Sequence, residues 1–373
     1  MPAFDLAVVG AGIVGLAHAL AAARRGLKVV VVDRDPAAMG ASIRNFGFVT
    51  VTGQADGETR RRALRSRDVW EEIAKQAGFP VHQHGALIVA RRPEAREVLA
   101  AFAATPHGEA CELHDAIQAR RRWPMLAAGL SGALWSPYEL RVDAREALPK
   151  LAAWLAQAHG VEFRWDVTIA GFEGTRLAHA EGAIEAGAVV LATGEGIRAL
   201  APELARRARL RSCRLQMLRT VAQPSSFQLG AVLMSDLSLV RYEGFAALRP
   251  AKALRERLEA EVPQSLARGV HLIVSQGSDG SLVVGDSHDY GDGASPFSSE
   301  FVEALILDEL DAVLDVPRPG IAERWMGSYP VADGGPVLSE RLGERVQAVL
   351  VSGGTGMSTA FALGEETLAG LFG

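Results

Sequence analysis

The stretch "DLAVVGAGIVGLAHALAAARRGLKVVVVDRD", residues 5–35, opens with a short apolar run that ends at Val9. Glycines follow in the spacing G-x-G-x-x-G, and residues 13–25 have the composition of a helix. A second apolar run, residues 28–32, ends at Asp33, roughly twenty residues after the glycines. This succession of strand, glycine turn, helix, strand and acidic residue predicts a Rossmann-type unit that binds a dinucleotide, and therefore an α/β fold.

The glycines of this turn have separate physical tasks. Gly10 makes the tight turn, Gly12 lets the backbone approach a pyrophosphate, and Gly15 allows the helix to pack closely on the strand. Ile13 and Val14 begin the helix, where free N–H groups and the positive end of the helix dipole attract phosphates. We therefore expect all five residues at the cofactor.

The acidic residue at the end of the second strand indicates which nucleotide binds. The Asp33 carboxylate would accept hydrogen bonds from ribose hydroxyls and would repel a 2′-phosphate, so NADP is disfavoured even though Arg34 follows. Both residues are predicted cofactor contacts. A glycine-rich turn in another kind of α/β protein is the alternative, and it leaves Asp33 unexplained.

Length and composition limit the remaining possibilities. The 373 residues predict two interleaved domains or one large domain with an insertion. A content of 49% hydrophobic and 22% charged residues is typical of a globular α/β enzyme. A net charge of -5 argues against nucleic-acid binding, which needs surplus cations. Cys111 and Cys213 lack the spacing of a metal site or redox pair, and we expect neither a targeting segment nor a membrane span. A cytoplasmic monomer or small homo-oligomer is the expectation.

Two further glycine turns are suited to the same cofactor. "VVLATGEGI", residues 189–197, reads as a buried strand that runs into a turn. "AVLVSGGTGMSTAFALGEETLAGLF", residues 348–372, reads as strand, glycine turn and helix, and the start of that helix could face the electron-accepting edge of a redox ring. The predicted contacts are Ala192, Thr193, Gly194, Gly353, Gly354, Thr355, Gly356 and Met357.

Together these stretches resemble the D-amino acid oxidase superfamily of FAD enzymes, which includes glycine oxidase and sarcosine oxidase. The resemblance implies a Rossmann-type FAD-binding domain, split in sequence, and an α+β substrate domain with a mostly antiparallel sheet. The implied FAD domain comprises residues 1–80, 143–212 and 324–373, and the substrate domain comprises residues 81–142 and 213–323. Further FAD contacts are implied at Ser42, Arg44, Asn45, Phe46, Gly47 and Val167. Some relatives tether FAD through a cysteine near the C-terminal glycines; this chain has none there, so we expect noncovalent FAD.

Several segments have patterns that suit the substrate sheet. Residues 84–91, 239–250 and 270–291 alternate or run apolar between turn residues, which is typical of strands. Residues 143–158 are predicted to form a helix that is capped by Asp143 and returns the chain to the FAD domain.

Tyr329 departs from the pattern of the superfamily. "WMGSYPVADGGP", residues 325–336, corresponds to W-x-G-x-R-P followed by D-x-x-P, in which the arginine clamps a substrate carboxylate. A phenol cannot replace that charged fork, so the carboxylate is either absent from the substrate or held elsewhere. The alternative is that Tyr329 only packs, with a neighbouring arginine in the binding role.

Other stretches resemble one subgroup of these FAD oxidoreductases, which is linked with the breakdown of aminophosphonates such as 2-aminoethylphosphonate and its N-methyl or hydroxy derivatives. They are "SIRNFGFVTVTGQ" (42–54), "SLVRYEGF" (238–245), "VHLIVSQGSDGSLVVGDSHDYG" (270–291) and "ERWMGSYP" (323–330). Such a substrate has a tetrahedral anion and needs no carboxylate clamp. A small anionic amine is therefore the expected partner, with oxygen or another electron acceptor.

Arginines are the natural anchors for that anion. Arg44 follows the second strand, and Arg241 lies beside Tyr242 on a predicted strand of the substrate sheet. Arg44 could instead bind the FAD pyrophosphate, and Arg241 could be an ordinary solvated residue. Tyr242 and Tyr329 would donate hydrogen bonds to the anion oxygens.

His288 is the remaining catalytic candidate, because Asp286, Ser287 and Asp289 could fix its tautomer or raise its pKa. Tyr290 and His271 are further candidates. We expect no metal, since this acidic cluster lacks a clear second ligand group elsewhere in the sequence.

The sequence therefore favours an FAD-dependent oxidase of an aminoalkylphosphonate that yields an aldehyde, an amine or ammonia, and hydrogen peroxide. A second hypothesis is an oxidase or dehydrogenase of glycine-like, N-methyl or D-amino acids, with Arg241 or Arg44 at the carboxylate. A third is a nucleotide-binding regulator without catalysis, because a fold alone does not establish a function.

Overall fold

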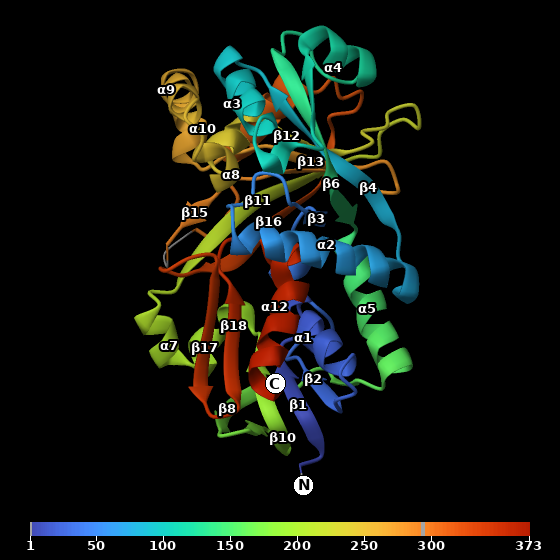
Figure 1. The fold of residues 1–373 in the computed structure, drawn as a ribbon, viewed down its shortest axis with the longest axis vertical. Helices are drawn as coiled ribbons and strands as arrows, with labels where there is room; N and C mark the ends of the chain where they lie inside the picture. The colour runs from blue at the N-terminus through green and yellow to red at the C-terminus, as the bar shows by residue number, and fades with distance from the viewer. Residues whose placement is uncertain (1, 292–294) are drawn as a thin grey trace.

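The computed structural model describes residues 2–291 and 295–373, which form two sheets stacked along the long axis of the molecule (Figure 1). One sheet and its helices make up the lower part of the view, where both chain ends lie, and the other sheet makes up the upper part. The two sheets are the α/β and antiparallel layers that the sequence predicts, so the expected fold class is confirmed.

The lower sheet contains the glycine-turn unit. β1 runs parallel to both β2 and β10, and Leu6 pairs with Val29 on one side and Ala188 on the other. β2, with the sequence VVVV, is buried throughout, as expected for a strand covered on both faces. The strand order is β17 (Val337–Gly343), β18 (Val346–Val351), β10 (Gly182–Leu191), β1 (Phe4–Val9), β2 (Val29–Val32) and β7 (Glu162–Arg164), and β8 (Ile169–Glu173) and β9 (Arg176–His179) extend β10.

Helices cover both faces of this sheet. α1 packs against α12, and the indole of Trp70 in α2 donates a hydrogen bond of 2.7 Å to the Met357 carbonyl, which ties α2 to the start of α12. α5 begins at the predicted cap, where the Asp143 carboxylate accepts a hydrogen bond of 3.0 Å from the Arg145 amide. The helices of this part are α1 (Ile13–Ala23), α2 (Glu58–Ala77), α5 (Ala144–His159), α6 (Ile197–Leu200), α7 (Pro202–Arg207) and α12 (Gly356–Phe372).

The upper sheet is antiparallel except where β12 pairs with β4. Its strand order is β15 (Asp289–Tyr290), β11 (Arg211–Thr220), β14 (Leu282–Gly285), β13 (Ile273–Gln276), β12 (Val232–Met234), β4 (Val81–Ala90), β6 (Gly132–Val142) and β3 (Phe48–Val49); β16 (Ile321–Val331) also pairs with β11, and β5 (Glu112–Asp115) with β6. β11 and β16 both cross a predicted domain boundary, at 212/213 and 323/324, and both belong to this sheet. The domain boundaries themselves stay a prediction.

Short helices pack around the upper sheet and share a single apolar core with it. They are α3 (Pro93–Ala103), α4 (Ala116–Arg122), α8 (Glu243–Ala246), α9 (Ala251–Glu261), α10 (Pro263–Ala267) and α11 (Glu300–Val313). Within the described part of the chain, no helix is both long and apolar enough to cross a membrane.

One predicted strand is wrong. Residues 239–250 form the end of a 3-10 helix, η4 (Asp236–Val240), followed by α8, and they contribute no strand to the upper sheet. Residues 236–240 are all buried, so the alternation of polar and apolar residues there does not separate a solvent face from a core face. Arg241 and Tyr242 therefore lie at a helix junction, where the backbone turns, instead of on a strand.

Candidate active site

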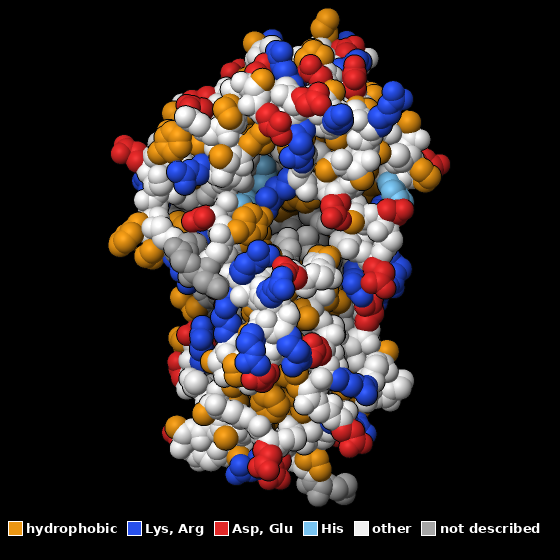
Figure 2. Space-filling view, turned by 90° about the vertical axis from the view of Figure 1, so that its left-hand side faces the viewer, with side chains coloured by type: hydrophobic (Ala, Val, Ile, Leu, Met, Phe, Trp, Pro, Cys, Tyr) orange, Lys and Arg blue, Asp and Glu red, His pale blue; other side chains and the backbone are white. Residues whose placement is uncertain are grey.

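A single cavity of about 730 Å³ connects the glycine turn of the lower sheet to one face of the upper sheet. Figure 2 shows the molecule hollowed between its upper and lower parts on the face turned toward the viewer. Most of the predicted site residues line this cavity; Gly15 and Gly47 are the exceptions. A Cβ atom on Gly15 would lie 1.8 Å from the Gly10 carbonyl oxygen, and one on Gly47 would lie 1.7 Å from that of Val142, so both are buried contacts of the backbone.

The side chains of Asp33 and Ser42 accept hydrogen bonds from backbone amides of the glycine turn. One Asp33 carboxylate oxygen accepts a hydrogen bond of 2.6 Å from the Ala11 amide, and the other accepts one of 3.0 Å from the Asp35 amide. The Ser42 hydroxyl accepts a hydrogen bond of 3.0 Å from the Ile13 amide at the start of α1. Asp33 thus stabilises the turn, a role that the sequence does not reveal, and its bonds to a ribose stay a prediction.

The nucleotide end of the cavity fits a dinucleotide. The N-termini of α1 and α12 both open onto it, and in neither helix does the side chain of the N-cap residue, Gly12 or Thr355, bond to the first amides of the described chain. The hydroxyls of Thr193 and Thr355 are buried there and have no hydrogen-bond partner among the described residues, which leaves two donors available to a ligand. The Val167 amide already donates to the Asp33 carbonyl at 2.9 Å, so only the carbonyl of Val167 could contact adenine.

Arg241 lies at the opposite end of the cavity, between η4 and α8. It is half-buried, and its guanidinium donates a hydrogen bond of 2.9 Å to the Tyr290 hydroxyl. Among residues 2–291 and 295–373, no carboxylate forms an ion pair with it. A desolvated guanidinium that has only a phenol as partner can accept an anionic ligand in a bidentate geometry.

Tyr329 and Tyr290 are brought together by strand register. Cys213 in β11 pairs with Tyr290 of β15 and also with Tyr329 of β16, so these side chains share one face of the sheet. The Tyr329 ring lies against Gly354, where an added Cβ would be 3.3 Å from its Cζ atom. Burial raises the pKa of Tyr329 well above its usual value, so the phenol keeps its proton and can donate it in a hydrogen bond.

The two arginine candidates differ in their surroundings. Arg44 also lines the cavity, but it is exposed, and its guanidinium makes a long contact of 3.5 Å with the Met326 carbonyl. Its own carbonyl accepts a hydrogen bond of 3.2 Å from the Trp325 indole.

Tyr242 lies edge-on to His271, with the ring centres 5.9 Å apart. Burial raises the pKa of the Tyr242 phenol.

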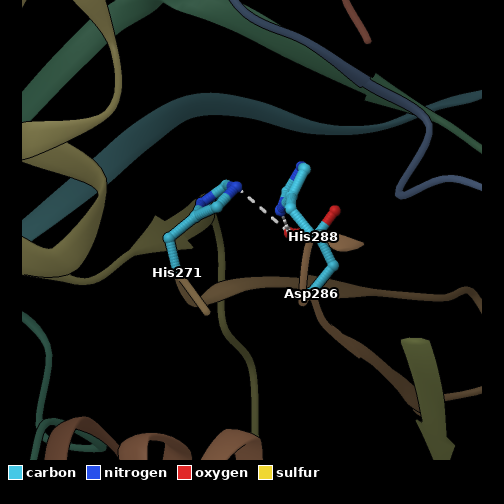
Figure 3. Close-up of side chains that lie close together, drawn as sticks. All are labelled: His271, Asp286 and His288. Carbon is cyan, nitrogen blue, oxygen red and sulfur yellow. Dashed lines mark ion pairs between the residues drawn. The ribbon is translucent and has the colours of Figure 1, made fainter. Parts of the chain in front are cut away.

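His271, Asp286 and His288 form a buried cluster on the cavity wall (Figure 3). Reciprocal backbone hydrogen bonds of 3.1 and 3.0 Å join His271 and Asp286 just beyond the β13–β14 hairpin, so their side chains meet. His271 Nε2 is 3.1 Å from Asp286 Oδ1, and His271 Nδ1 is 3.2 Å from the Ser238 hydroxyl. His288 Nδ1 is 3.0 Å from the Gly269 carbonyl and 3.7 Å from Asp286 Oδ1.

These contacts fix the protonation of the cluster. A carbonyl only accepts hydrogen bonds, so His288 Nδ1 carries the proton and Nε2 is the acceptor. Burial lowers the pKa of His288 to about 3 and also lowers that of His271, so both imidazoles are neutral. Burial acts to raise the pKa of Asp286, but the hydrogen bond from His271 and the positive charge of Arg241 act in the opposite direction, and the pKa of that carboxyl is lowered.

The cluster contains the second ligand group that the sequence does not reveal. His271, Asp286 and His288 each offer a ligand atom within 4.8 Å of the others. From the sequence His271 is a weaker candidate than His288, because the distance along the chain between His271 and Asp286 hides their backbone pairing. The hairpin pattern of residues 270–291 is the signal that could have revealed it.

The apolar part of the cavity wall was missed as well. Leu215 and Met217 share one face of β11 with Cys213, and Ile273 begins β13, which is separated from β11 by β14. The period of two along β11 could have identified these residues once the inward face was known. They give the substrate end a dry surface around Arg241 and the histidine cluster.

Comparison with known proteins agrees with this geometry. The family model described as FAD dependent oxidoreductase matches residues 5–369. Monomeric sarcosine oxidase from Bacillus sp. (strain B-0618) is 32% identical over 127 residues, and the match spans 32% of this chain and 32% of that relative. The chain therefore matches only about a third of the length of this curated relative.

Solved structures share the fold over nearly the whole chain. Glycine oxidase from Bacillus cereus ATCC 14579 has a TM-score of 0.78 at 16% identity, covering 99% of this chain and 94% of that chain. L-alpha-glycerophosphate oxidase from Mycoplasma pneumoniae, solved with FAD bound, has a TM-score of 0.77 at 18% identity, covering 99% of this chain and 94% of that chain. With the family match, the glycine turn and the open helix N-termini, these findings show that the chain belongs to the FAD-dependent oxidoreductase family, with FAD as its cofactor.

Proposed function

We propose that this chain oxidises the amine-bearing carbon of a small aminoalkylphosphonate, either 2-aminoethylphosphonate or its N-methyl or 1-hydroxy derivative. The observation that carries the proposal is Arg241, a guanidinium on the cavity wall whose hydrogen-bond partner is the Tyr290 phenol. With the protonated phenol of Tyr329 on the same sheet face, it provides several donors for a group with more than two anionic oxygens.

The position of Tyr329 favours a phosphonate over a carboxylate. In the pattern that residues 325–336 resemble, an arginine stands there and grips the flat carboxylate with its fork. Here the cation comes from Arg241, at the junction of η4 and α8. The phenol of Tyr329 stands at the position of the arginine in that pattern. A tetrahedral anion can contact donors from different directions, whereas a carboxylate is best held by two parallel bonds from one fork.

The chemistry divides between cofactor and protein. Bound FAD supplies the two-electron acceptor, so the protein has to bind the amine, orient its C–H bond and exclude water. Arg241 and the phenols would hold the anionic end, while the neutral His288 offers an acceptor nitrogen to the amine. Loss of a hydride and a proton from the amine would give an imine, and water would hydrolyse it to a phosphonoacetaldehyde-type aldehyde and an amine or ammonia. The two electrons would then reduce oxygen, with two protons, to hydrogen peroxide.

The test is an anaerobic comparison of substrates. We would add 2-aminoethylphosphonate, its N-methyl and 1-hydroxy derivatives, glycine and sarcosine to separate samples of the purified flavoprotein. We expect rapid loss of the visible flavin absorption with a phosphonate and at most slow loss with glycine or sarcosine. Bleaching by glycine or sarcosine alone would refute the phosphonate assignment, and bleaching by none of these amines would count against amine oxidation.

The alternative function is oxidation of glycine-like, N-methyl or D-amino acids, with the substrate carboxylate on Arg241. The observation in its favour is the resemblance to a sarcosine oxidase in sequence and to a glycine oxidase in fold. The same anaerobic comparison of substrates separates the two proposals. Air is then admitted to the reduced samples, and formation of hydrogen peroxide would identify oxygen as the electron acceptor.

A further inference from the structure

Two opposite charges lie on the wall of one cavity without pairing. Asp286 and Arg241 both line the substrate end, yet they do not form an ion pair with each other. Buried opposite charges normally pair, because an isolated charge away from water has a high free energy. A cavity wall that carries both charges without an ion pair between them is complementary to a ligand that carries one charge of each sign, which is a zwitterion.

The surroundings of Asp286 leave its charge available to a ligand. Only 5% of the residue is exposed. In the described part of the chain, no arginine or lysine pairs with it, and its two neighbours at 3.1 and 3.7 Å are imidazoles. Oδ1 is buried beside His271 Nε2, at 3.1 Å. A buried carboxylate that has neutral imidazoles as its neighbours lacks the cation that would compensate its desolvation.

We propose that Asp286 is the residue that recognises the cationic amine of the substrate, while Arg241 on the same cavity wall holds the anion. The inference rests on the proposed function in that the substrate is an amine with an anionic group, and it adds which residue selects the amine. His271 is a positioning residue: it donates from Nε2 toward Asp286 while its Nδ1 accepts from the Ser238 hydroxyl. A neutral molecule with the same anionic end would gain nothing from Asp286.

A bound metal is the competing use of these residues, because the three ligand atoms lie within 4.8 Å of one another. The hydrogen bonds favour the amine. His288 Nδ1 points at the Gly269 carbonyl and needs its proton there, and His271 has a protein partner on each nitrogen. The guanidinium of Arg241 also contributes positive charge to the same cavity.

The experiment compares ligands with and without the nitrogen in the Asp286→Asn variant. Anaerobic flavin reduction gives the apparent Kd of 2-aminoethylphosphonate, and perturbation of the flavin spectrum gives that of its isostere propylphosphonate. We expect the substitution to weaken the amine about 10- to 100-fold, as for a lost charged hydrogen bond, and the isostere less than about 2-fold. Equal weakening of both ligands would overturn the proposal.

Two controls keep this outcome interpretable. Glu309→Gln removes another buried carboxylate, which pairs with Arg91 outside the cavity, and should leave both affinities unchanged. If Asp286→Asn fails to retain FAD, His271→Gln takes its place, with an expected amine-selective loss of about 3-fold. Stoichiometric zinc or iron in the purified holoenzyme would overturn the inference in favour of a metal site.

A second ligand pair separates this inference from the proposed function. Sarcosine and butyrate differ in the same nitrogen but carry a carboxylate. If sarcosine reduces the flavin and the phosphonates do not, the proposed substrate fails; an amine-selective loss in Asp286→Asn with this pair would still support the inference. If Asp286→Asn left the preference for the amine unchanged with both ligand pairs, the role of Asp286 would be refuted, and the proposed substrate would not be affected.

Discussion

The two ends of the cavity are built in different ways. At the nucleotide end, the backbone makes the site: Gly10 and Gly15 approach each other so closely that no side chain fits, and two helix N-termini supply the donors. At the substrate end, side chains make the site, and Arg241, Asp286 and Tyr329 come from separate segments of the chain. A site made from backbone leaves a continuous signature in the sequence, whereas a site made from side chains depends on register and turns.

The largest expected effect is at the backbone end. Gly15→Ala places a Cβ 1.8 Å from the Gly10 carbonyl oxygen, where only backbone could move, so we expect loss of folded, flavin-loaded protein. The measurement is flavin content and thermal unfolding after purification. Gly370→Ala in α12 is the control, since no atom lies within 4 Å of its added Cβ, and its Tm should be unchanged or higher. A stable yellow Gly15→Ala protein would contradict this account of the turn.

Arg241→Met tests the side-chain end with the next largest effect. Removing the guanidinium leaves the substrate anion without its cation, so kcat/KM should fall about 100- to 1,000-fold with flavin content unchanged. Arg44→Met is the matched control: Arg44 is exposed on the same cavity, and we expect a loss below about 10-fold. If Arg44→Met were the more damaging change, the anchor would be wrongly assigned.

A pH titration of stability tests a buried histidine in α1, the helix that follows the glycine turn. In α1, burial lowers the pKa of His18 to about 4. Below about pH 6.5, His18 therefore binds a proton in the unfolded chain, whereas in the folded chain it stays neutral down to about pH 4. The sign is destabilising as pH falls, and His18 alone should remove about 2 kcal/mol between pH 7 and pH 5. Denaturant unfolding of wild type and His18→Asn at both pH values measures it. An equal loss in both proteins would exclude His18 as the cause.

Tyr329→Phe has the smallest expected effect. The ring and its contact with Gly354 remain, and only one hydrogen bond to the anion is lost, so kcat/KM should fall about 5- to 10-fold. The measurement is steady-state kinetics of wild type and Tyr329→Phe, with the substrate that reduces the flavin in the anaerobic test. An unchanged kcat/KM would mean that the phenol packs without touching the anion, which is the alternative interpretation of this residue.

The sequence predicts much of the nucleotide end and less of the substrate end, for a physical reason. The glycine turn, the helix after it and Asp33 are neighbours in sequence, so their spacing alone predicts their arrangement. The junction at Arg241 was mistaken for a strand, because five consecutive buried residues before it obscure any alternation. The pairing of His271 with Asp286 requires knowledge of the hairpin register, which local pattern does not supply.

The Tyr329 ring lies against Gly354, so the two ends meet at this contact among others. β16 belongs to the upper sheet, whereas the glycine turn before α12 belongs to the lower part. A chimera that took its C-terminal strand and helix from another family member would therefore bring an unmatched residue against the phenol. Any exchange of substrate preference between relatives has to transfer β16 and this turn as one module.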